Sequence, residues 1–499
     1  MTRKIIVNVG PYETRAAILE NEVLQELFFD VKDTEKIVGC IFKGRVANIM
    51  SGMQSAFVNI GQQKDAFLTL SSVESVAGAD SEEDFKDVYR NLIQDMIKVG
   101  QEVLVQVLKE PSAGKGPRST MILSLPGRYL VLTPLVDHIG VSRIIGNETE
   151  RERLRSIGRK VCPKGMGIIL RTAAEGVEER ELNSDLKFLL KLWRKIEEKA
   201  KSMPLFSLIH QDLSLPMKLV RDFFTDDVSK FVIDSAEEYK SILEVCDFLS
   251  PLQRASMELY EGDVPLFEKF GIENEIKNAL QKKLWLKSGG YIFLERTEAL
   301  VSIDVNSGRF SGGSGLEETV FRVNMEAAKE IARQVRIRNL AGVIVIDFID
   351  MENPKHRDQV VKSLREAFKG DRNRPHILDI SELGLVQMTR RRTSHSIEEI
   401  LKSECPRCGG DGVTLSVSTI ANRIRKTVLE DAKRFDTEKI IVTGHPEVVF
   451  FFKEDEEFRL KELAARANRE VIFVEDKTCS IEAFKIEPVL SQSKMEPLK

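Results

Sequence analysis

The sequence has few cysteines, no long apolar run and no excess of charge of one sign. Six cysteines scattered through 499 residues cannot build a disulfide framework, which predicts a reducing, cytoplasmic compartment. No run reaches the roughly 18 apolar residues of a membrane helix, and the first residues lack an apolar signal region, so we expect no membrane-spanning segment. Lys plus Arg number 74 against 78 Asp plus Glu, which excludes a protein that is basic throughout. A local basic patch could still bind nucleic acid.

The composition, with 42% hydrophobic and 30% charged residues, is typical of a soluble protein with several folded domains. Residues 39–126 contain short alternating strands between Gly and Ser turns, a pattern typical of a small closed barrel of the OB type. Residues 272–400 alternate strands, including one expected strand over 291–305, with long helices. A last small α/β segment follows residue 415. The sequence therefore predicts a multidomain α/β protein.

Acidic residues end two apolar strands, in SIDVNSG at 302–308 and VIVIDFID at 343–350. Asp304 and Asn306 are two apart, so their side chains share one face of a strand, and Asp347 ends a strand that we expect to be a neighbour. Two carboxylates and an amide form an oxygen-rich site that suits Mg²⁺. The alternative is that these strand-end aspartates only cap turns. Asp350 is either a further ligand or the start of the next loop.

The segment CPRCGGDG at 405–412 is half of a zinc site, because two thiolates three residues apart can reach one tetrahedral ion. The chain has no second Cys-x-x-Cys, so we expect Cys405 and Cys408 of two chains to share the ion in a symmetric dimer. A redox pair or a plain turn are the alternatives. Zinc is favoured because no thioredoxin-like context is predicted around the motif.

Several groups could contact a nucleic acid. In the barrel region, Phe57 and Phe67 with Lys115 could stack bases and bind phosphate, unless both rings belong to the core. Arg171 and Thr172 end the strand GIILRT and offer a guanidinium fork and a hydroxyl to a terminal phosphate monoester. A further set of arginines is either a phosphate-facing group or a solvated surface: Arg333, Arg336, Arg338, Arg372, Arg374, Arg390, Arg391 and Arg392.

Taken together, these segments resemble the ribonuclease E/G family of bacterial endoribonucleases. The resemblance covers nearly the whole chain in family order and favours the G type, which lacks the long disordered C-terminal scaffold of the E type. It rests on IFKGRVANIMSGMQSAFVNIGQQKDAFL, SRIIG, GMGIILRTAAEG, LVSIDVNSGRF, LEETVFRVNMEAAKEIARQVRIRNLAGVIVIDFIDM, LVQMTRRR and ECPRCGGDG.

The resemblance implies an ordered set of domains. An RNase H-like subdomain is split around an OB-fold domain and a 5′-end sensor region, and a DNase I-like catalytic subdomain, a zinc link and a small domain follow. The implied ranges are 1–38 and 216–278 (RNase H-like), 39–126 (OB-fold), 127–215 (5′-end sensor), 279–400 (DNase I-like), 401–415 (zinc link) and 416–499 (small C-terminal domain).

The resemblance also implies roles for residues of this chain. Asp304 and Asp347 would bind Mg²⁺, with Asn306 beside them as the third catalytic residue. Cys405 and Cys408 would bind zinc between two chains of a homodimer, or of a higher oligomer. Single-stranded RNA would run over Phe57, Phe67 and Lys115. The 5′-monophosphate sensor would comprise Gly127, Val131, Arg171, Thr172 and Arg374.

The expected function is a Mg²⁺-dependent endoribonuclease that prefers 5′-monophosphorylated single-stranded RNA and acts in rRNA maturation and mRNA decay. A water-derived nucleophile would leave a 5′-phosphate and a 3′-hydroxyl. No histidine belongs to this group of residues, which argues against a metal-free route through a cyclic phosphate. Two alternatives stay open at this point: a non-catalytic RNA-binding or assembly factor, and a nuclease that acts on DNA.

Overall fold

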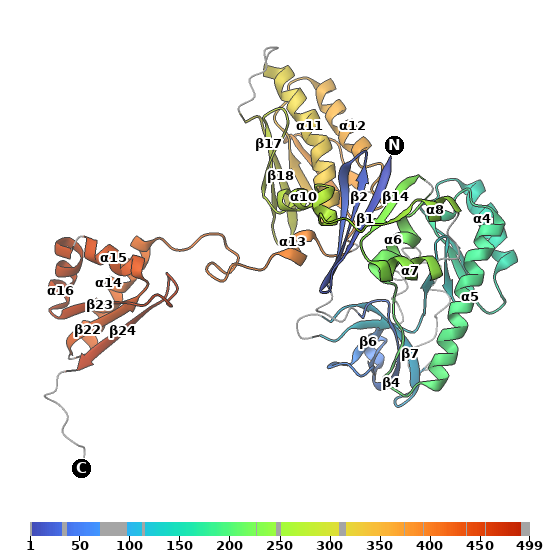
Figure 1. Cartoon of the computed structure of the whole chain (residues 1–499). Helices are drawn as coiled ribbons and strands as arrows, with labels where there is room; N and C mark the ends of the chain where they lie inside the picture. Colours follow the sequence, from blue (N-terminus) through green and yellow to red (C-terminus); the bar gives the residue numbers. More distant parts are fainter. Residues whose placement is uncertain are drawn as a thin grey trace. The chain divides into compact units, whose positions relative to one another are not determined.

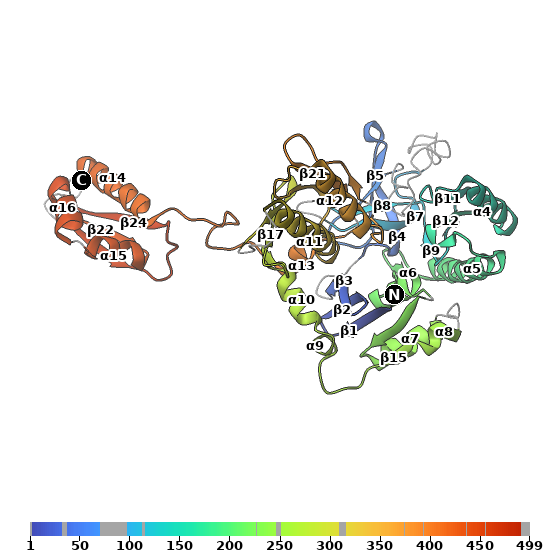
Figure 2. The ribbon, with the colours of Figure 1, turned by 90° about the horizontal axis from the view of Figure 1, so that it is seen from above.

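The computed structural model describes most of the chain as two compact units, residues 1–400 and 401–499. In the described residues, the first unit holds four β-sheets and the second unit holds one. Figures 1 and 2 show the helices and strands of both units. The predicted multidomain α/β class is therefore confirmed. The described residues are 2–31, 37–69, 97–111, 115–225, 227–245, 251–308, 316–373, 375–392, 394–435, 437–454 and 456–490.

The first sheet joins the start of the chain to a segment more than 200 residues later. Its strands, in spatial order, are β15 (Met257–Leu259), β14 (Val228–Ile233), β1 (Arg3–Val9), β2 (Glu13–Glu20) and β3 (Val23–Val31). Strands β1 and β2 form an antiparallel hairpin, and β14 pairs with β1 in parallel. Ile5 and Val7 pack toward α6 (Leu215–Phe223) and α7 (Ala236–Val245), whereas Ile6 packs toward α9 (Leu266–Lys269) and α10 (Ile272–Ala279).

The second sheet is the predicted OB-type barrel. Its strands are β4 (Ile41–Met50), β5 (Ser55–Asn59), β6 (Ala66–Thr69), β7 (Glu102–Lys109) and β8 (Arg118–Thr120), with β13 (Leu208–His210) added beside β4. The first half of β4 pairs with β7 and its second half pairs with β5, which closes the barrel. Gly116 is required next to β8, because a Cβ there would lie 2.1 Å from the carbonyl oxygen of Asp65.

The third sheet has four short strands. They are β9 (Leu125–Pro126), β10 (Leu130–Thr133), β11 (Ile139–Val141) and β12 (Gly167–Leu170). The helices α4 (Glu148–Val161) and α5 (Glu179–Ser202) contribute to its core. The N-terminus of α4 is capped by the side chain of Asn147. Helix α5 buries Leu182, Leu186, Leu189 and Trp193 at helical spacing, so its apolar stripe faces this sheet.

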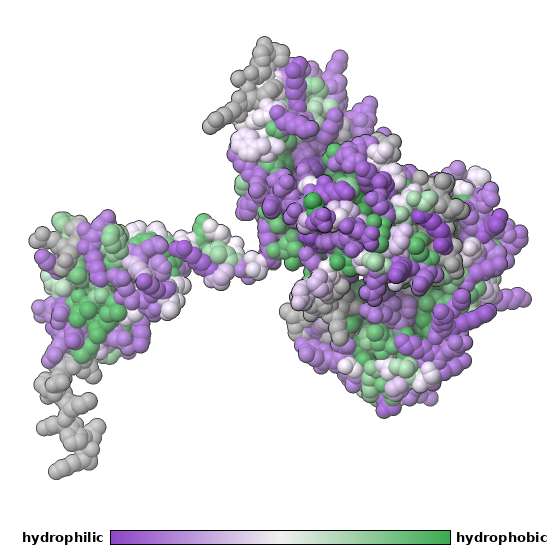
Figure 3. Space-filling model, viewed as in Figure 1, coloured by the Kyte–Doolittle hydropathy of each residue, from purple (hydrophilic) through white to green (hydrophobic). Residues whose placement is uncertain are grey.

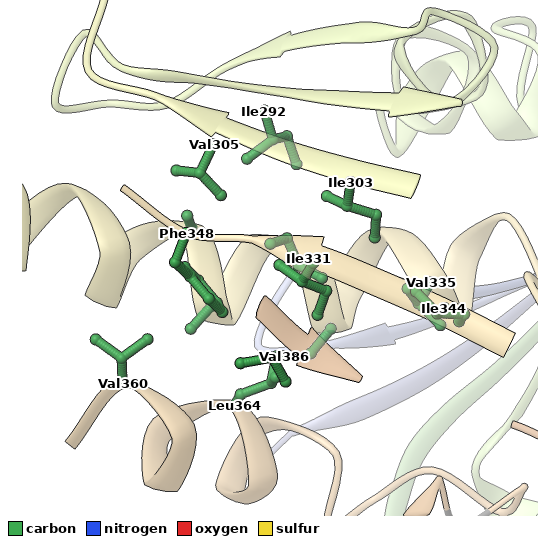
Figure 4. Packing of buried hydrophobic residues seen from close by; sticks show 14 of the residues in the cluster. Ile292, Ile303, Val305, Ile331, Val335, Ile344, Phe348, Val360, Leu364 and Val386 are labelled. Atoms are coloured by element: carbon green, nitrogen blue, oxygen red, sulfur yellow. The ribbon is translucent and has the colours of Figure 1, made fainter. Parts of the chain in front are cut away.

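The fourth sheet carries the acidic strand ends. Its spatial order is β16 (Lys283–Trp285), β17 (Tyr291–Arg296), β18 (Leu300–Asn306), β19 (Gly342–Asp347), β21 (Leu385–Arg390) and β20 (His376–Ile377). Figure 4 shows Ile292, Ile303 and Ile344 in the core with side chains of α11 (Leu316–Ile337) and α12 (Pro354–Ala367). The single strand expected over 291–305 is wrong, because a turn at 297–299 folds it into the hairpin β17–β18.

The second unit is a small α/β domain. Its elements are α14 (Val417–Arg434), β22 (Thr437–Gly444), α15 (Pro446–Glu454), a π-helical turn (Glu456–Lys461), α16 (Glu462–Ala467), β23 (Glu470–Glu475) and β24 (Phe484–Leu490). Strand β22 pairs in parallel with β23 and antiparallel with β24. Ile440 and Val442 pack toward the helices, and Figure 3 shows a hydrophobic patch over this sheet. Of all the helices that the structure describes, none has the length and apolar character needed to cross a membrane.

Candidate active site

The two strand-end aspartates of the fourth sheet lie side by side. Strands β18 and β19 are parallel neighbours, and Asp304 and Asp347 are direct partners in their register. Both carboxylates are exposed, because the alternate residues Ile303 and Ile346 face the helices. The Asn306 amide donates a 2.7 Å hydrogen bond to Asp304 Oδ2. The three residues that the sequence singled out therefore meet on one open face of the sheet.

The electrostatics of this pair favour a bound cation. Partial burial raises the pKa of Asp347, and the negative charges of Asp304 and Asp350 raise it further. A dication would relieve that repulsion. Within the described ranges, no group of three or more His, Cys, Asp or Glu residues gathers around a common point. The protein's donors would thus be two carboxylates and an amide, which fits Mg²⁺ because that ion keeps several water or phosphate oxygens.

A buried asparagine fixes the chain just beyond Asp347. Asn324 of α11 is fully buried; its amide donates to the Ile349 carbonyl at 2.8 Å and its carbonyl oxygen accepts from the Ile349 N–H at 3.2 Å. The prediction missed this residue. The sequence does contain an indication of its role, because Asn324 is a polar residue on the apolar stripe of α11, between Val323 and Ala327. A buried amide at such a position needs hydrogen-bond partners.

The aromatic pair of the barrel lies outside its core. Phe57 and Phe67 are direct partners on β5 and β6, with ring centroids 5.5 Å apart, and both are half-buried. The core interpretation is therefore wrong, since Ala56 and Val58 fill the barrel instead. Lys115 is exposed, and the strand that follows it pairs Arg118 with Phe67. Aromatic and basic groups therefore share this part of the barrel surface.

Arg171 and Thr172 follow β12 at the end of the third sheet. Arg171 Nη1 donates to the Gly127 carbonyl at 2.6 Å and to Asp222 Oδ1 at 2.8 Å. The Thr172 hydroxyl lies 3.3 Å from that of Ser142. Gly127 packs closely on Asp185, since a Cβ there would lie 2.6 Å from a carboxylate oxygen.

The other predicted sensor residues fall beneath this site or outside the described residues. The Val131 side chain is buried in the third sheet, and its part in the sensor stays a prediction. Arg374 lies outside the residues that the structure describes.

Three guanidinium groups converge on Asp222, which the sequence analysis did not single out. Arg221 forms a bidentate salt bridge with the Asp222 carboxylate, and Arg171 donates to one of the two carboxylate oxygens. Arg372, from the segment after α12, donates to the Asp222 carbonyl and lies over the Phe223 ring. Burial alone would raise the pKa of Asp222, but its bonds to Arg221 and Arg171 lower it overall. Asp185 is a further electrostatic neighbour of Arg171, and Glu26 is one of Arg372, so carboxylates balance these guanidinium groups.

Most of the other arginines hold the fold together. Arg390 is buried and binds Asp371 at 2.6 Å, and the buried Arg338 donates to Gln334 and to the Gln281 carbonyl. The phosphate-facing interpretation is wrong for these two. The further arginines with carboxylate partners are Arg333 (with Glu330 and Glu275), Arg336 (with Glu26) and Arg392 (with Glu399).

The two cysteines of the CPRCGGDG segment lie on a tight, glycine-rich turn. Both thiols are free; Cys405 is exposed, and the Gly412 N–H points to Cys408 Sγ at 3.2 Å. The backbone N–H groups of Arg407 and Cys408 lower the pKa of Cys405. The described residues supply no acidic or histidine partner that would complete a four-ligand site with this pair. Among the described residues, Cys405 and Cys408 thus supply two of the four ligands of a zinc site.

Comparison with known families identifies the chain. The model of the Ribonuclease E/G family matches residues 124–393, more than half of the sequence. The chain belongs to the ribonuclease E/G family. Ribonuclease G of Escherichia coli K12 is 40% identical over 475 residues, covering 94% of this chain and 96% of the relative. Ribonuclease G of Haemophilus influenzae is 40% identical over 91% of the chain, and ribonuclease E of Nostoc is 38% identical over 84% of it.

Two further models match parts of this ribonuclease E/G family member. An S1 RNA binding domain covers residues 35–120, which agrees with the barrel. A model described as an RNase E/G thioredoxin-like domain covers residues 404–489. The prediction that Cys405 and Cys408 have no thioredoxin-like context is therefore wrong. The motif nevertheless precedes α14 instead of joining a strand to a helix, so its placement alone gives no preference for redox chemistry.

Proposed function

We propose that this member of the ribonuclease E/G family is a Mg²⁺-dependent endoribonuclease that cleaves single-stranded RNA. Its active site would contain Asp304 and Asp347. Endoribonuclease activity follows from the family and from relatives named ribonuclease G and ribonuclease E. The observation that carries the assignment of the site is the register of β18 and β19, which makes the two carboxylates direct neighbours on an open face. Like charges placed opposite each other destabilise a sheet, so a purely structural pair is unfavourable.

Each residue of the site has a distinct role in the proposed mechanism. Asp304 and Asp347 would hold the metal, which when bound supplies an activated water and neutralises charge on the scissile phosphate. Asn306, held by its bond to Asp304, would orient the phosphate or the attacking water through its remaining amide groups. Water attack on phosphorus displaces the 3′-oxygen of the upstream nucleotide. The products are then a 3′-hydroxyl and a 5′-phosphate.

The barrel and the third sheet would select the substrate. The half-exposed rings of Phe57 and Phe67, together with Lys115, favour single strands because unstacked bases can lie on aromatic rings. The guanidinium of Arg171 and the hydroxyl of Thr172, at the end of β12, favour a 5′-terminal monophosphate. Roles in rRNA maturation and mRNA decay in the cytoplasm are proposed from the family resemblance.

A homodimer through a shared zinc ion is the proposed assembly. Cys405 and Cys408 supply two thiol ligands and a preformed turn, and a second chain would supply the same pair. The division into RNase H-like and DNase I-like subdomains, and a higher oligomer, stay predictions.

The two alternative functions are weaker. A non-catalytic RNA-binding factor has no reason to turn two adjacent carboxylates toward a polyanion. A DNA nuclease is disfavoured by the match to an S1 RNA binding domain.

The direct test is incubation of the purified chain with matched 5′-monophosphorylated RNA and DNA single strands, in Mg²⁺ or in EDTA. We expect cleavage of the RNA alone, and only with Mg²⁺. Equal cleavage in EDTA would exclude the proposed mechanism.

A further inference from the structure

Aromatic side chains lie directly beside the proposed catalytic residues on the same face of the fourth sheet. The register places Trp285, Tyr291 and Asn306 in one row across β16, β17 and β18. The next row on this face contains Lys283, Phe293, Asp304 and Asp347. We call Trp285, Tyr291 and Phe293 the aromatic platform.

The platform is not part of the hydrophobic core. The core side of these strands is formed by Leu284, Ile292 and Leu294, which pack with α11 and α12. Trp285 is 62% exposed, and its ring meets Tyr291 edge to face with centroids 5.3 Å apart. The chain has only two tryptophans, and the other, Trp193, is 3% exposed. Exposing an aromatic ring of this size to water is unfavourable, and a ligand that covers the ring would explain why it lies beside the acidic site.

A positive charge accompanies the platform. The Lys283 ammonium lies 3.7 Å from the centroid of the Tyr291 ring and 4.4 Å from that of Trp285. Lys283 also shares a row with Asp304, two strands away, a separation of about 10 Å. An exposed cation–π contact is weak, so a phosphate can draw the ammonium away from the rings.

We propose that the aromatic platform stacks bases of the RNA next to the scissile phosphate, while Lys283 binds the adjoining backbone. This inference rests on the proposed cleavage site at Asp304 and Asp347. Base faces stack on aromatic rings whatever the base, so the platform holds the strand in register without reading its sequence. It positions RNA on the catalytic sheet itself, apart from the aromatic pair of the barrel.

A single-stranded nucleic acid fits this face better than a second copy of the chain. The rows alternate rings with Lys283, Asp304, Asn306 and Asp347, so a protein contact here would bury unpaired carboxylates. RNA offers both a π-face for each ring and a phosphate for the ammonium. Asp304 and Asp347 would hold the metal, and phosphate oxygens of the same RNA would be available to it as further ligands.

The two tryptophans allow a direct test that does not depend on cleavage. The full-length Asp347→Asn variant is titrated with a 5′-hydroxyl single-stranded RNA while tryptophan emission is recorded. Stacking on Trp285 should quench the exposed component of the emission and leave that of buried Trp193. Adding Trp285→Phe should abolish the quenching. Unchanged emission at RNA saturation, measured in parallel by filter binding, would overturn the proposal.

Cleavage kinetics give the second readout. Trp285→Ala should raise KM roughly tenfold with little change in kcat, and Trp285→Phe should restore most of the loss. Phe450→Ala is the matched control, because Phe450 is also 62% exposed but belongs to the second unit. An unchanged KM for Trp285→Ala, or a changed oligomeric state with unchanged RNA affinity, would overturn the platform. Cleavage by Asp347→Asn would instead overturn the proposed site, so the two failures are distinguishable.

Discussion

Asp304 and Asp347 are direct register partners on two parallel strands, although their segments are separated by the whole of helix α11. Adjacent parallel strands lie about 4.8 Å apart, so the two carboxylates begin from neighbouring backbone positions. Their mutual repulsion contributes to the raised pKa of Asp347. The pairing of β18 with β19 therefore holds the two carboxylates close together against their mutual repulsion.

Asn324 is predicted to maintain that arrangement. Asn324→Leu would leave the N–H and carbonyl of Ile349 without their buried partners, at a cost of about 1–3 kcal/mol in the free energy of unfolding. It should also lower kcat, because Ile349 is two residues from Asp347. Urea unfolding and steady-state cleavage measure the two effects. Arg322→Ala, on the exposed face of the same helix, should change neither. A fully active and equally stable Asn324→Leu would contradict this role.

Arg171→Ala should slow the cleavage of 5′-monophosphorylated RNA by roughly 10- to 150-fold. This range corresponds to the loss of about 1.5–3 kcal/mol from one charge-assisted contact. Cleavage of 5′-hydroxyl RNA by the same variant should stay close to that by the wild type, which controls for the lost bonds to Gly127 and Asp222. Arg159→Ala, at an exposed arginine of α4, should behave as wild type on both substrates. Equal slowing of both RNAs would count against a 5′-phosphate sensor.

The double variant Cys405→Ser with Cys408→Ser should lose zinc and shift the protein toward monomer. Wild-type protein should contain about one zinc per two chains, because each chain offers two of four ligands. Elemental analysis together with sedimentation at several concentrations measures both quantities. Cys479→Ser is the matched control, since this thiol bonds to the Ala483 carbonyl in the second unit. One zinc per chain, or a double variant that is still dimeric at low concentration, would refute the shared site.

The sequence predicted the parts of the site that depend on local order. Alternation of side chains along a strand places Asp304 and Asn306 on one face whatever the sheet order. Two strands joined by a helix usually pair in parallel, which predicted that Asp347 lies next to Asp304. The barrel also followed from strand spacing. The motif segments then carried the resemblance that the family match confirms.

The remaining features depend on contacts between distant segments. The sequence did not indicate the ion pair of Arg390, because its partner Asp371 lies 19 residues earlier. Arg372 reaches Asp222 from 150 residues away, a contact that periodicity cannot indicate. The aromatic platform was missed because a turn at 297–299 places Tyr291 beside Asn306, whereas a single strand would have kept them apart.

The central claim is that Asp304 and Asp347 carry the chemistry, and one paired measurement tests it most directly. Cleavage rate and filter-binding affinity are measured on the same single-stranded RNA for wild type, Asp304→Asn and Asp347→Asn. A neutral amide is a poor ligand for a hard dication, so each variant should lose nearly all cleavage. RNA affinity should hold or rise, since negative charge leaves the face that binds a polyanion. Cleavage by both variants at close to the wild-type rate would show that the two strand-end aspartates only cap the sheet.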